Sequence, residues 1–143
     1  MTTLDTLGEL GLIDRIRNAT PAPVQPGTIR GLGDDAAVFA FSDSELGLLA
    51  TSMLLEGIHF DLTYMPLRHL GFKAVAVNVS DIAAMNGLPT QITVSLGLSS
   101  RFTVEAVDEL YAGIRAACEA YNIDLVGGDT TSSRSGLIIS VSV

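Results

Sequence analysis

The sequence predicts an α/β (α+β) fold in which a mixed or antiparallel sheet is covered by helices on one face. Three observations support this class. Two long segments, residues 67–85 and 104–121, carry apolar side chains at helical spacing. Residues 91–98 alternate apolar and polar side chains with the two-residue period of a half-buried strand. Further short apolar runs, bounded by glycine or polar turns, supply the remaining strands.

The first half of the chain predicts a helix followed by two strands. Leu4, Leu7, Leu10, Ile13 and Ile16 recur at three-residue steps, which favours one apolar face of a short helix. The segment PAPVQPG is a connector because proline and glycine interrupt regular structure. The runs AAVFAF and LGLLATSML follow, joined by the turn-like SDSE, and they predict an antiparallel pair of strands.

The second half predicts helix, strand, helix and two strands. A helix from Leu67 ends at Asn86-Gly87, with Pro89 just beyond, and the strand QITVSLGL follows. Thr103 is a candidate N-cap and Asn122 a candidate C-terminal stop for the next helix. IDLVGGDTTSSRSGLIISVSV then predicts two strands joined by a long polar turn, and we expect further protein beyond the final strand.

Composition limits the partners. The 143 residues suit one domain, and the formal net charge of −8 would repel a polyphosphate, which argues against nucleic acid. Lys73 is the only lysine, so a bound phosphate would need metal ions, arginines or backbone amides. The single cysteine, Cys118, favours a buried structural thiol. Because signal-peptide and membrane-span patterns are missing, the sequence predicts a soluble cytoplasmic protein.

Three carboxylate motifs stand beside glycine, serine or threonine: GLGDDA with Asp34 and Asp35, NVSDIAAM with Asp81, and VGGDTT with Asp129. Magnesium prefers hard oxygen ligands, and glycine lets a phosphate approach the backbone, so together they suggest a metal and phosphate site. Each also has an ordinary structural explanation, because aspartate commonly caps turns. Asp81 fits that explanation least well, since it interrupts an apolar helix.

Other signals are weaker. GLGDDA matches the loose dinucleotide pattern G-x-G-x-x-A, but aspartates stand where a pyrophosphate would lie and a strand follows. The P-loop pattern is not present in the sequence. His59 and His69 are more often hydrogen-bonded structural residues than ligands.

The segments ELGLIDRI, GLGDDAAVF, TSMLLEGIHFD, LGFKAVAVNVSDIAAMNGLP and LVGGDTT, in this order, resemble the N-terminal half of bacterial thiamine-monophosphate kinase. That family belongs to the aminoimidazole ribonucleotide synthetase-like superfamily. The resemblance implies one N-terminal ATP- and magnesium-binding domain over residues 1–143, with the family's C-terminal domain absent from this chain. It implies transfer of the γ-phosphoryl group of ATP to thiamine monophosphate, several Mg²⁺ ions, no covalent protein intermediate and a homodimer formed through strands.

The resemblance also assigns residues. Asp35, Thr51, Asp81 and Asp129 would hold magnesium, with Asp34 a weaker candidate. Gly128, Asp129 and Tyr111 would contact ATP, and His59 would contact thiamine monophosphate. No side chain is assigned as a catalytic acid, base or nucleophile, because positioning and metal electrostatics suit phosphoryl transfer.

Two departures from the family keep alternatives open. The chain reads Ala50-Thr51-Ser52 where the family has serine, threonine and a metal-binding aspartate, so one metal site should be weaker or absent. The missing C-terminal half predicts that this fragment alone has little or no turnover. The alternatives are a non-catalytic dimerisation module of the same fold, or another superfamily member similar to selenophosphate or aminoimidazole ribonucleotide synthetases.

Overall fold

A computed structural model describes residues 4–143 and divides the chain into two compact units, with the boundary between Leu48 and Leu49. Each unit is described here by itself. The prediction of a single domain over residues 1–143 stays a prediction.

The first unit contains one helix and a small sheet. Helix α1 (Leu4–Ala19) is kinked at Gly8, whose φ of 69° is outside the helical range. Strands β1 (Thr28–Arg30), β2 (Ala37–Ala40) and β3 (Leu46–Leu49) form a three-stranded sheet in the order β1-β2-β3. Sequence patterns missed β1, because three residues are too few to show a period.

The predicted apolar face of α1 does not become a core within the described residues. None of the residues of α1 is buried, and Leu4, Leu10, Ile13 and Ile16 are between 40% and 79% exposed. The three-residue spacing correctly predicted a helix, but the kink at Gly8 rotates the first turn relative to the rest. The apolar side chains therefore remain available for contacts outside this unit.

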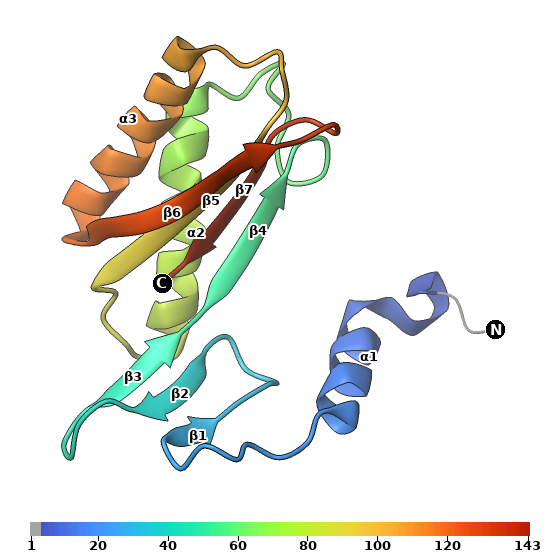
Figure 1. The fold of residues 1–143 in the computed structure, drawn as a ribbon, viewed down its shortest axis with the longest axis vertical. Coiled ribbons are helices and arrows are strands. Elements are labelled where there is room, and N and C mark those ends of the chain that lie inside the picture. Colours follow the sequence, from blue (N-terminus) through green and yellow to red (C-terminus); the bar gives the residue numbers. More distant parts are fainter. Residues whose placement is uncertain (1–3) are drawn as a thin grey trace. The chain divides into compact units, whose positions relative to one another are not determined.

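The second unit is a four-stranded mixed sheet (Figure 1). Strands β4 (Thr51–Leu55), β5 (Gln91–Leu98), β6 (Asp124–Ser132) and β7 (Ile138–Ser142) are arranged in the order β4-β7-β5-β6. β5 and β6 run parallel, whereas β7 pairs antiparallel with both β4 and β5. The run LGLLATSML is therefore split between two sheets, because it supplies all of β3 and most of β4.

Helices α2 (Leu67–Ala84) and α3 (Val104–Tyr121) cover one face of this sheet, as predicted (Figure 1). The Thr103 side chain accepts a hydrogen bond from the Ala106 N–H and caps α3, and Asn122 ends it in the left-handed conformation. Asn86, with φ 57°, follows the end of α2. The fold class is thus confirmed, with two sheets in place of one.

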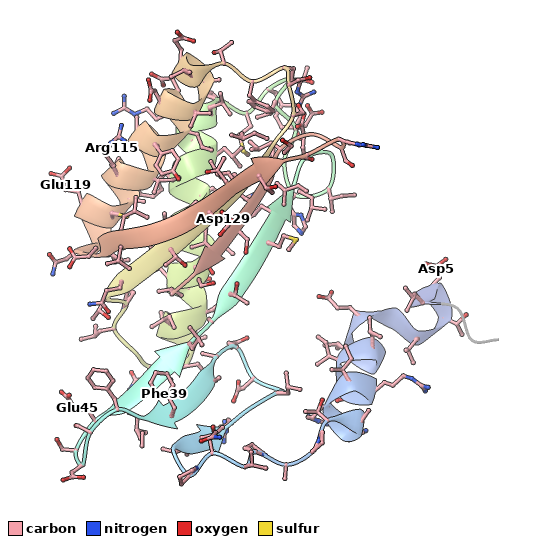
Figure 2. The ribbon with its side chains drawn as sticks, in the orientation of Figure 1. Asp5, Phe39, Glu45, Arg115, Glu119 and Asp129 are labelled. Carbon is pink, nitrogen blue, oxygen red and sulfur yellow. The ribbon has the colours of Figure 1, made fainter. Side chains whose placement is uncertain are left out.

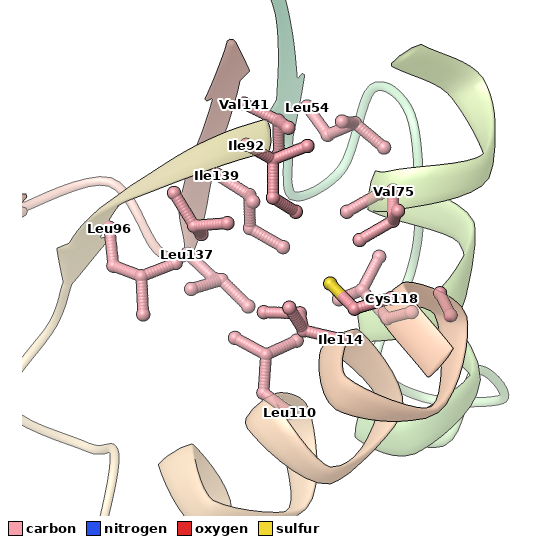
Figure 3. Close-up of a cluster of buried hydrophobic side chains, with 14 of the residues drawn as sticks. Leu54, Val75, Ile92, Leu96, Leu110, Ile114, Cys118, Leu137, Ile139 and Val141 are labelled. Atoms are coloured by element: carbon pink, nitrogen blue, oxygen red, sulfur yellow. The ribbon is translucent and has the colours of Figure 1, made fainter. Parts of the chain in front are cut away.

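The core lies between the four-stranded sheet and the two helices (Figure 3). Ile92, Val94 and Leu96 of β5 are at most 2% exposed, and they belong to one core cluster with Leu110 and Ile114 of α3. Burying each such side chain stabilises the fold by about 1.5–3 kcal/mol. The opposite face of the sheet is not covered by these helices. The polar residues that alternate with the core residues along each strand lie on that face.

Cys118 belongs to this core, as the sequence predicted (Figure 3). It is 8% exposed and unpaired. Burial, assisted by the negative charge of Asp124, raises the pKa of the Cys118 thiol above its ordinary value. The thiol therefore stays protonated at neutral pH and acts as a small apolar side chain.

The two helices of the second unit pack at unusually close range. A Cβ atom placed on Gly71 of α2 would lie 2.1 Å from the Leu110 carbonyl oxygen, and one on Gly113 of α3 would lie 1.9 Å from the Arg68 carbonyl oxygen. Only glycine permits this approach of the two backbones. Within residues 4–143, no helix is both long and apolar enough to span a membrane.

Candidate active site

Ser52 and Asp81 form a side-chain pair on the helix-covered side of the four-stranded sheet. The Ser52 hydroxyl, from β4, donates to Asp81 Oδ2, from the last turns of α2, at 3.2 Å. Both residues are half-buried. The carboxylate that interrupts the apolar helix therefore has a partner, which lowers the cost of its partial burial. Ser52 is also the position where the thiamine-monophosphate kinase pattern has aspartate, so the departure lies in direct contact with a predicted metal ligand.

Thr51 is adjacent in sequence, but its side chain is on the other face of the sheet because strand side chains alternate. Its hydroxyl donates to the Val141 carbonyl oxygen at 3.1 Å and accepts from the Ser142 hydroxyl at 3.1 Å. A metal ion at Thr51 would be bound through the remaining lone pair of this hydroxyl oxygen or would replace the Ser142 contact.

Asp129 lies on the exposed β6 strand (Figure 2). The strand register aligns it with Ser95 of β5, then with Ser140 of β7 and Met53 of β4. It lines a pocket of about 190 Å³ whose other walls include the hydroxyl-bearing residues Ser95, Thr131, Ser132, Ser133 and Ser140. Asp129 thus has several oxygen donors around it.

The sheet order separates Asp129 from Thr51. They are on opposite edge strands, β6 and β4, with β5 and β7 between them. At an inter-strand spacing of about 4.8 Å, three intervals put these strands about 14 Å apart. Ligands of one magnesium ion lie about 2.1 Å from it, so Thr51 and Asp129 of one chain do not share an ion.

Gly128 and Tyr111, two of the three residues predicted to contact ATP, have packing roles in the structure. Gly128 is in register with Val94, and a Cβ at Gly128 would lie 1.8 Å from the Val94 carbonyl oxygen. Tyr111 is on α3 and packs against the core cluster on the covered side of the sheet, whereas Asp129 aligns with the side chains of the uncovered side. The ATP contacts of Gly128, Asp129 and Tyr111 stay predictions.

His59 follows β4 and is exposed. Its Nδ1 atom accepts a hydrogen bond from the Leu55 N–H at 3.0 Å, and its carbonyl oxygen accepts one from the Lys73 ammonium at 2.8 Å. Because Nδ1 accepts this hydrogen bond, the ring proton of neutral His59 is on Nε2. The Nε2–H donor then points away from Leu55. This arrangement could donate to a ligand, and the thiamine monophosphate contact stays a prediction.

Asp34 and Asp35 lie in the turn between β1 and β2 of the first unit and are exposed. Asp34 accepts hydrogen bonds from the Arg30 guanidinium and from the Asp35 N–H. Asp34 is thus used in local structure, while the Asp35 carboxylate makes no hydrogen bond or ion pair inside the part of the chain that the structure describes. The assignment of Asp35 to magnesium, with Asp34 as the weaker candidate, stays a prediction.

Across residues 4–143, no three His, Cys, Asp or Glu side chains gather closely enough to hold a metal ion by themselves. Of the predicted ligands in the second unit, Thr51 and Asp81 both lie near the start of β4, but on opposite faces of the sheet. Asp81 and Ser52 offer three hard oxygen atoms there, and Thr51 offers a fourth on the other side of the strand. This donor chemistry suits Mg²⁺, with water and substrate phosphates completing the octahedron.

Glu56 is the contact residue that sequence patterns did not assign. Its carboxylate accepts a hydrogen bond from the Leu137 N–H at 2.8 Å and pairs with Arg101, and its own N–H donates to the Leu137 carbonyl oxygen at 3.0 Å. Glu56 therefore ties the end of β4 to the β5–α3 connection and to the β6–β7 turn. Its position directly before Gly57-Ile58 gave no signal, since its partners are 45 and 81 residues away in the chain.

The environment of Glu56 favours its charged form. Partial burial would raise its pKa, but the Leu137 N–H, the hydrogen bond from Arg101 and the Arg101 charge outweigh burial, so the pKa lies below its ordinary value. A carboxyl group with a lowered folded-state pKa stabilises the fold above its unfolded pKa. That stabilisation is lost as the pH falls through the folded-state pKa.

Glu56→Gln is therefore expected to lower the free energy of unfolding by about 1–2 kcal/mol at pH 7, because it removes the charge that Arg101 and the Leu137 N–H stabilise. The difference from the unchanged protein should shrink as the pH falls through the lowered folded-state pKa of Glu56, because Glu56 itself then becomes protonated. Urea unfolding at several pH values measures this. Glu119→Gln, on the outer face of α3, is the control and should have little effect at any pH (Figure 2). A pH-independent loss in Glu56→Gln would contradict the electrostatic explanation.

A family model described as AIR synthase related protein, N-terminal domain, matches residues 33–143. The chain belongs to this family. The match takes in the whole second unit and the turn with Asp34 and Asp35, so the residues assembled above are those of an AIR synthase related N-terminal domain.

Curated relatives include thiamine-monophosphate kinases from several bacteria. The one from Bacillus subtilis is 36% identical over 131 residues, and the one from Aquifex aeolicus is 40% identical over 130 residues. Each alignment covers 91% of this chain but 40% of the relative. The AIR synthase related N-terminal domain described here thus spans less than half the length of these relatives.

Comparison with solved structures supports the same family membership. The structure described as AaThiL complexed with AMPPCP and TMP matches 99% of this chain with a TM-score of 0.86 and 38% identity, and the match covers 43% of that chain. A HypE-HypF complex matches 92% of this chain with a TM-score of 0.63 but 19% identity, which shows a shared fold alone. The expected superfamily fold is confirmed for the AIR synthase related N-terminal domain.

Proposed function

We propose that this chain is the ATP- and magnesium-binding part of a thiamine-monophosphate kinase, which transfers the γ-phosphoryl group of ATP to thiamine monophosphate and forms thiamine diphosphate. The main support is the likeness over nearly the whole chain to a structure described with AMPPCP and TMP, at a TM-score of 0.86. AMPPCP is an ATP analogue. The whole enzyme's activity would also need residues outside the aligned portion, because the relatives are more than twice as long.

In this proposal Asp81 holds Mg²⁺ on the helix-covered side of β4, Thr51 is a ligand on the other side of that strand, and Asp129 holds an ion at the other edge of the sheet. Asp35 is a magnesium ligand of the first unit. More than one ion is required because Thr51 and Asp129 lie about 14 Å apart across the sheet. Bound magnesium would offset the repulsion between the two phosphates that react. His59 would donate from Nε2 to thiamine monophosphate, and the hydroxyl-lined pocket at Asp129 would take part of ATP.

We also propose a cytoplasmic homodimer. β4 is an edge strand that pairs with β7 on one side within its sheet, and Met53 on it is 56% exposed. An unpaired edge with an exposed apolar side chain suits pairing with a second copy. The net charge of −8 argues against nucleic acid or an anionic membrane surface as a partner.

The test is a phosphoryl-transfer assay on the protein as its gene encodes it, with ATP, MgCl₂ and one acceptor at a time. Thiamine monophosphate should give ADP and thiamine diphosphate in equal amounts by chromatography. Selenide and formylglycinamidine ribonucleotide, substrates of other superfamily enzymes, should give no product. EDTA should abolish turnover. Product from either of the other two acceptors, in place of thiamine diphosphate, would overturn the proposal.

Ser52 favours a second candidate, a non-catalytic dimerisation module, because a neutral hydroxyl stands where the family pattern has a carboxylate. The same assay separates the two. A protein that forms a dimer by light scattering but shows no ATP turnover with any acceptor would support the module over the kinase.

A further inference from the structure

A second pocket lies in the second unit, away from the predicted magnesium residues. It has a volume of about 550 Å³, within the usual range for small-molecule sites. Its polar walls come from the end of β4, the β5–α3 connection and the β6–β7 turn, namely Glu56, Ser99, Ser100, Arg101, Arg134 and Ser135. None of the residues assigned above to metal, ATP or thiamine monophosphate lines it, so it requires a separate explanation.

The charge of this pocket is opposite to that of the chain. Two of the eight basic residues, Arg101 and Arg134, line it against one carboxylate, Glu56, so the lining has a net charge of +1 while the whole chain has −8. Arg101 is already paired with Glu56. Arg134 is exposed and makes no hydrogen bond or ion pair to any residue from 4 to 143. Its guanidinium therefore has five unused donors in a fork that suits an oxyanion.

Ser99 adds an unused donor at the wall. Its hydroxyl oxygen is buried and has no hydrogen-bond partner among the residues that the structure describes. Buried hydroxyls almost always have a partner, because leaving one unpaired costs free energy. An anion oxygen in the pocket would supply that partner after a rotation about the Cα–Cβ bond of Ser99. Ser100 and Ser135 bring two further hydroxyls to the same lining.

The walls are held in place before any ligand arrives. Glu56 fixes Arg101 on one side and the Leu137 N–H, next to the β6–β7 turn, on the other. The Arg101 guanidinium also lies over the Phe102 ring, 5.1 Å from its centroid. A cation that is positioned in advance loses little freedom on binding, which favours affinity. Glu56 thus acts as a support that leaves Arg134 as the free charge.

We propose that this pocket binds a phosphate group, either free or as the phosphate of a small phosphate monoester. Arg134 supplies the charge-assisted hydrogen bonds, Arg101 the second positive charge, and the serine hydroxyls the remaining donors. Binding here needs no metal ion, because the positive charge comes from guanidinium groups. The inference goes beyond the proposed kinase function and stands or falls independently of it.

The test is a nuclear magnetic resonance titration of the ¹⁵N-labelled protein with inorganic phosphate and, separately, phenyl phosphate, in EDTA and at constant ionic strength. EDTA removes metal ions and so prevents metal-dependent phosphate binding. A failed titration therefore counts against this pocket alone, and a failed kinase assay counts against the proposed kinase function alone. Saturable shifts should appear at the amides of Gly57, Ser99, Ser100, Ser135 and Gly136. Arg134→Gln should weaken binding about tenfold. Arg115→Gln makes the same charge change at an exposed position on the outer side of α3 and should leave binding unchanged (Figure 2).

Tighter binding of phenyl phosphate than of inorganic phosphate would identify a phosphorylated molecule as the occupant, and equal affinity would identify free phosphate. Either supports the site. Shifts that do not saturate, that lie elsewhere, or that weaken equally in Arg134→Gln and Arg115→Gln would overturn it, since they would indicate nonspecific attraction between phosphate and positive charge. Arg134 lies in an exposed turn, so Arg134→Gln is expected to keep the fold, which the unperturbed part of the spectrum verifies.

Discussion

Gly128→Ala is expected to lower the free energy of unfolding by about 3 kcal/mol or more, at the upper end of the usual cost of overpacking. The added Cβ would lie 1.8 Å from the Val94 carbonyl oxygen and 2.8 Å from its carbon, where no real contact is possible. Because both atoms belong to the backbone of β5, the parallel pair β5 and β6 would have to separate. Urea unfolding followed by circular dichroism, in buffer free of nucleotide, measures the loss.

The neighbouring glycine is the matched control. A Cβ at Gly127 would meet only the Thr93 Cγ2 atom, at 3.7 Å, which is an ordinary van der Waals distance. Gly127→Ala should therefore change stability by less than about 1 kcal/mol, because it adds no clash and reduces the freedom of the unfolded chain. Equal stability of the two variants would show that the close strand approach at Gly128 is not required. That result would favour contact with a ligand as the reason for this glycine.

Asp81→Asn is expected to weaken magnesium-dependent binding of an ATP analogue about a hundredfold or more. The change keeps the size of the side chain and leaves an oxygen to accept from Ser52, but it removes the negative charge that a hard cation needs. Loss of groups that merely support a ligand typically costs 10- to 100-fold, so loss of a direct ligand should reach at least the upper value. Isothermal titration with AMPPCP, with and without MgCl₂, measures it on the protein as its gene encodes it.

Ser52→Asp has the opposite expectation. It would place a second carboxylate beside Asp81, where it would repel Asp81 without metal and add a charged oxygen ligand with metal. Magnesium should then raise the melting temperature of Ser52→Asp more than that of the unchanged protein. For the Asp81→Asn experiment, unchanged magnesium-dependent binding of AMPPCP would show that Asp81 is not a magnesium ligand. No added response to magnesium in Ser52→Asp would show that position 52 does not face the ion.

Elements with strong local patterns were predictable from the sequence. Residues 91–98 alternate and become β5, Thr103 and Asn122 delimit α3, and Asn86-Gly87 follows α2. These signals are local, since a cap or a two-residue period involves neighbours in the chain. The strand β1 was missed, because a three-residue strand has no measurable period. The apolar face predicted for α1 contains no buried residue, because spacing alone does not supply a packing partner.

The sequence predicted several residues of the candidate site, but it did not predict which of them lie close together. The carboxylates Asp35, Asp81 and Asp129 were found from their glycine and serine neighbours, while no pattern assigned a role to Glu56 or Arg134. The Glu56 contacts join residues 45 and 81 positions apart, which no local pattern encodes.

The sequence by itself determined the helices α2 and α3, the apolar residues of the core, the acidic motifs and the resemblance to a kinase family. Only the tertiary structure decided the strand order β4-β7-β5-β6, which puts Thr51 and Asp129 on opposite edges of one sheet and Ser52 against Asp81. It also decided that Arg101 and Arg134 share a pocket. The physical reason is that strand pairing is made by backbone hydrogen bonds between distant segments, and its register is set by which faces are buried together.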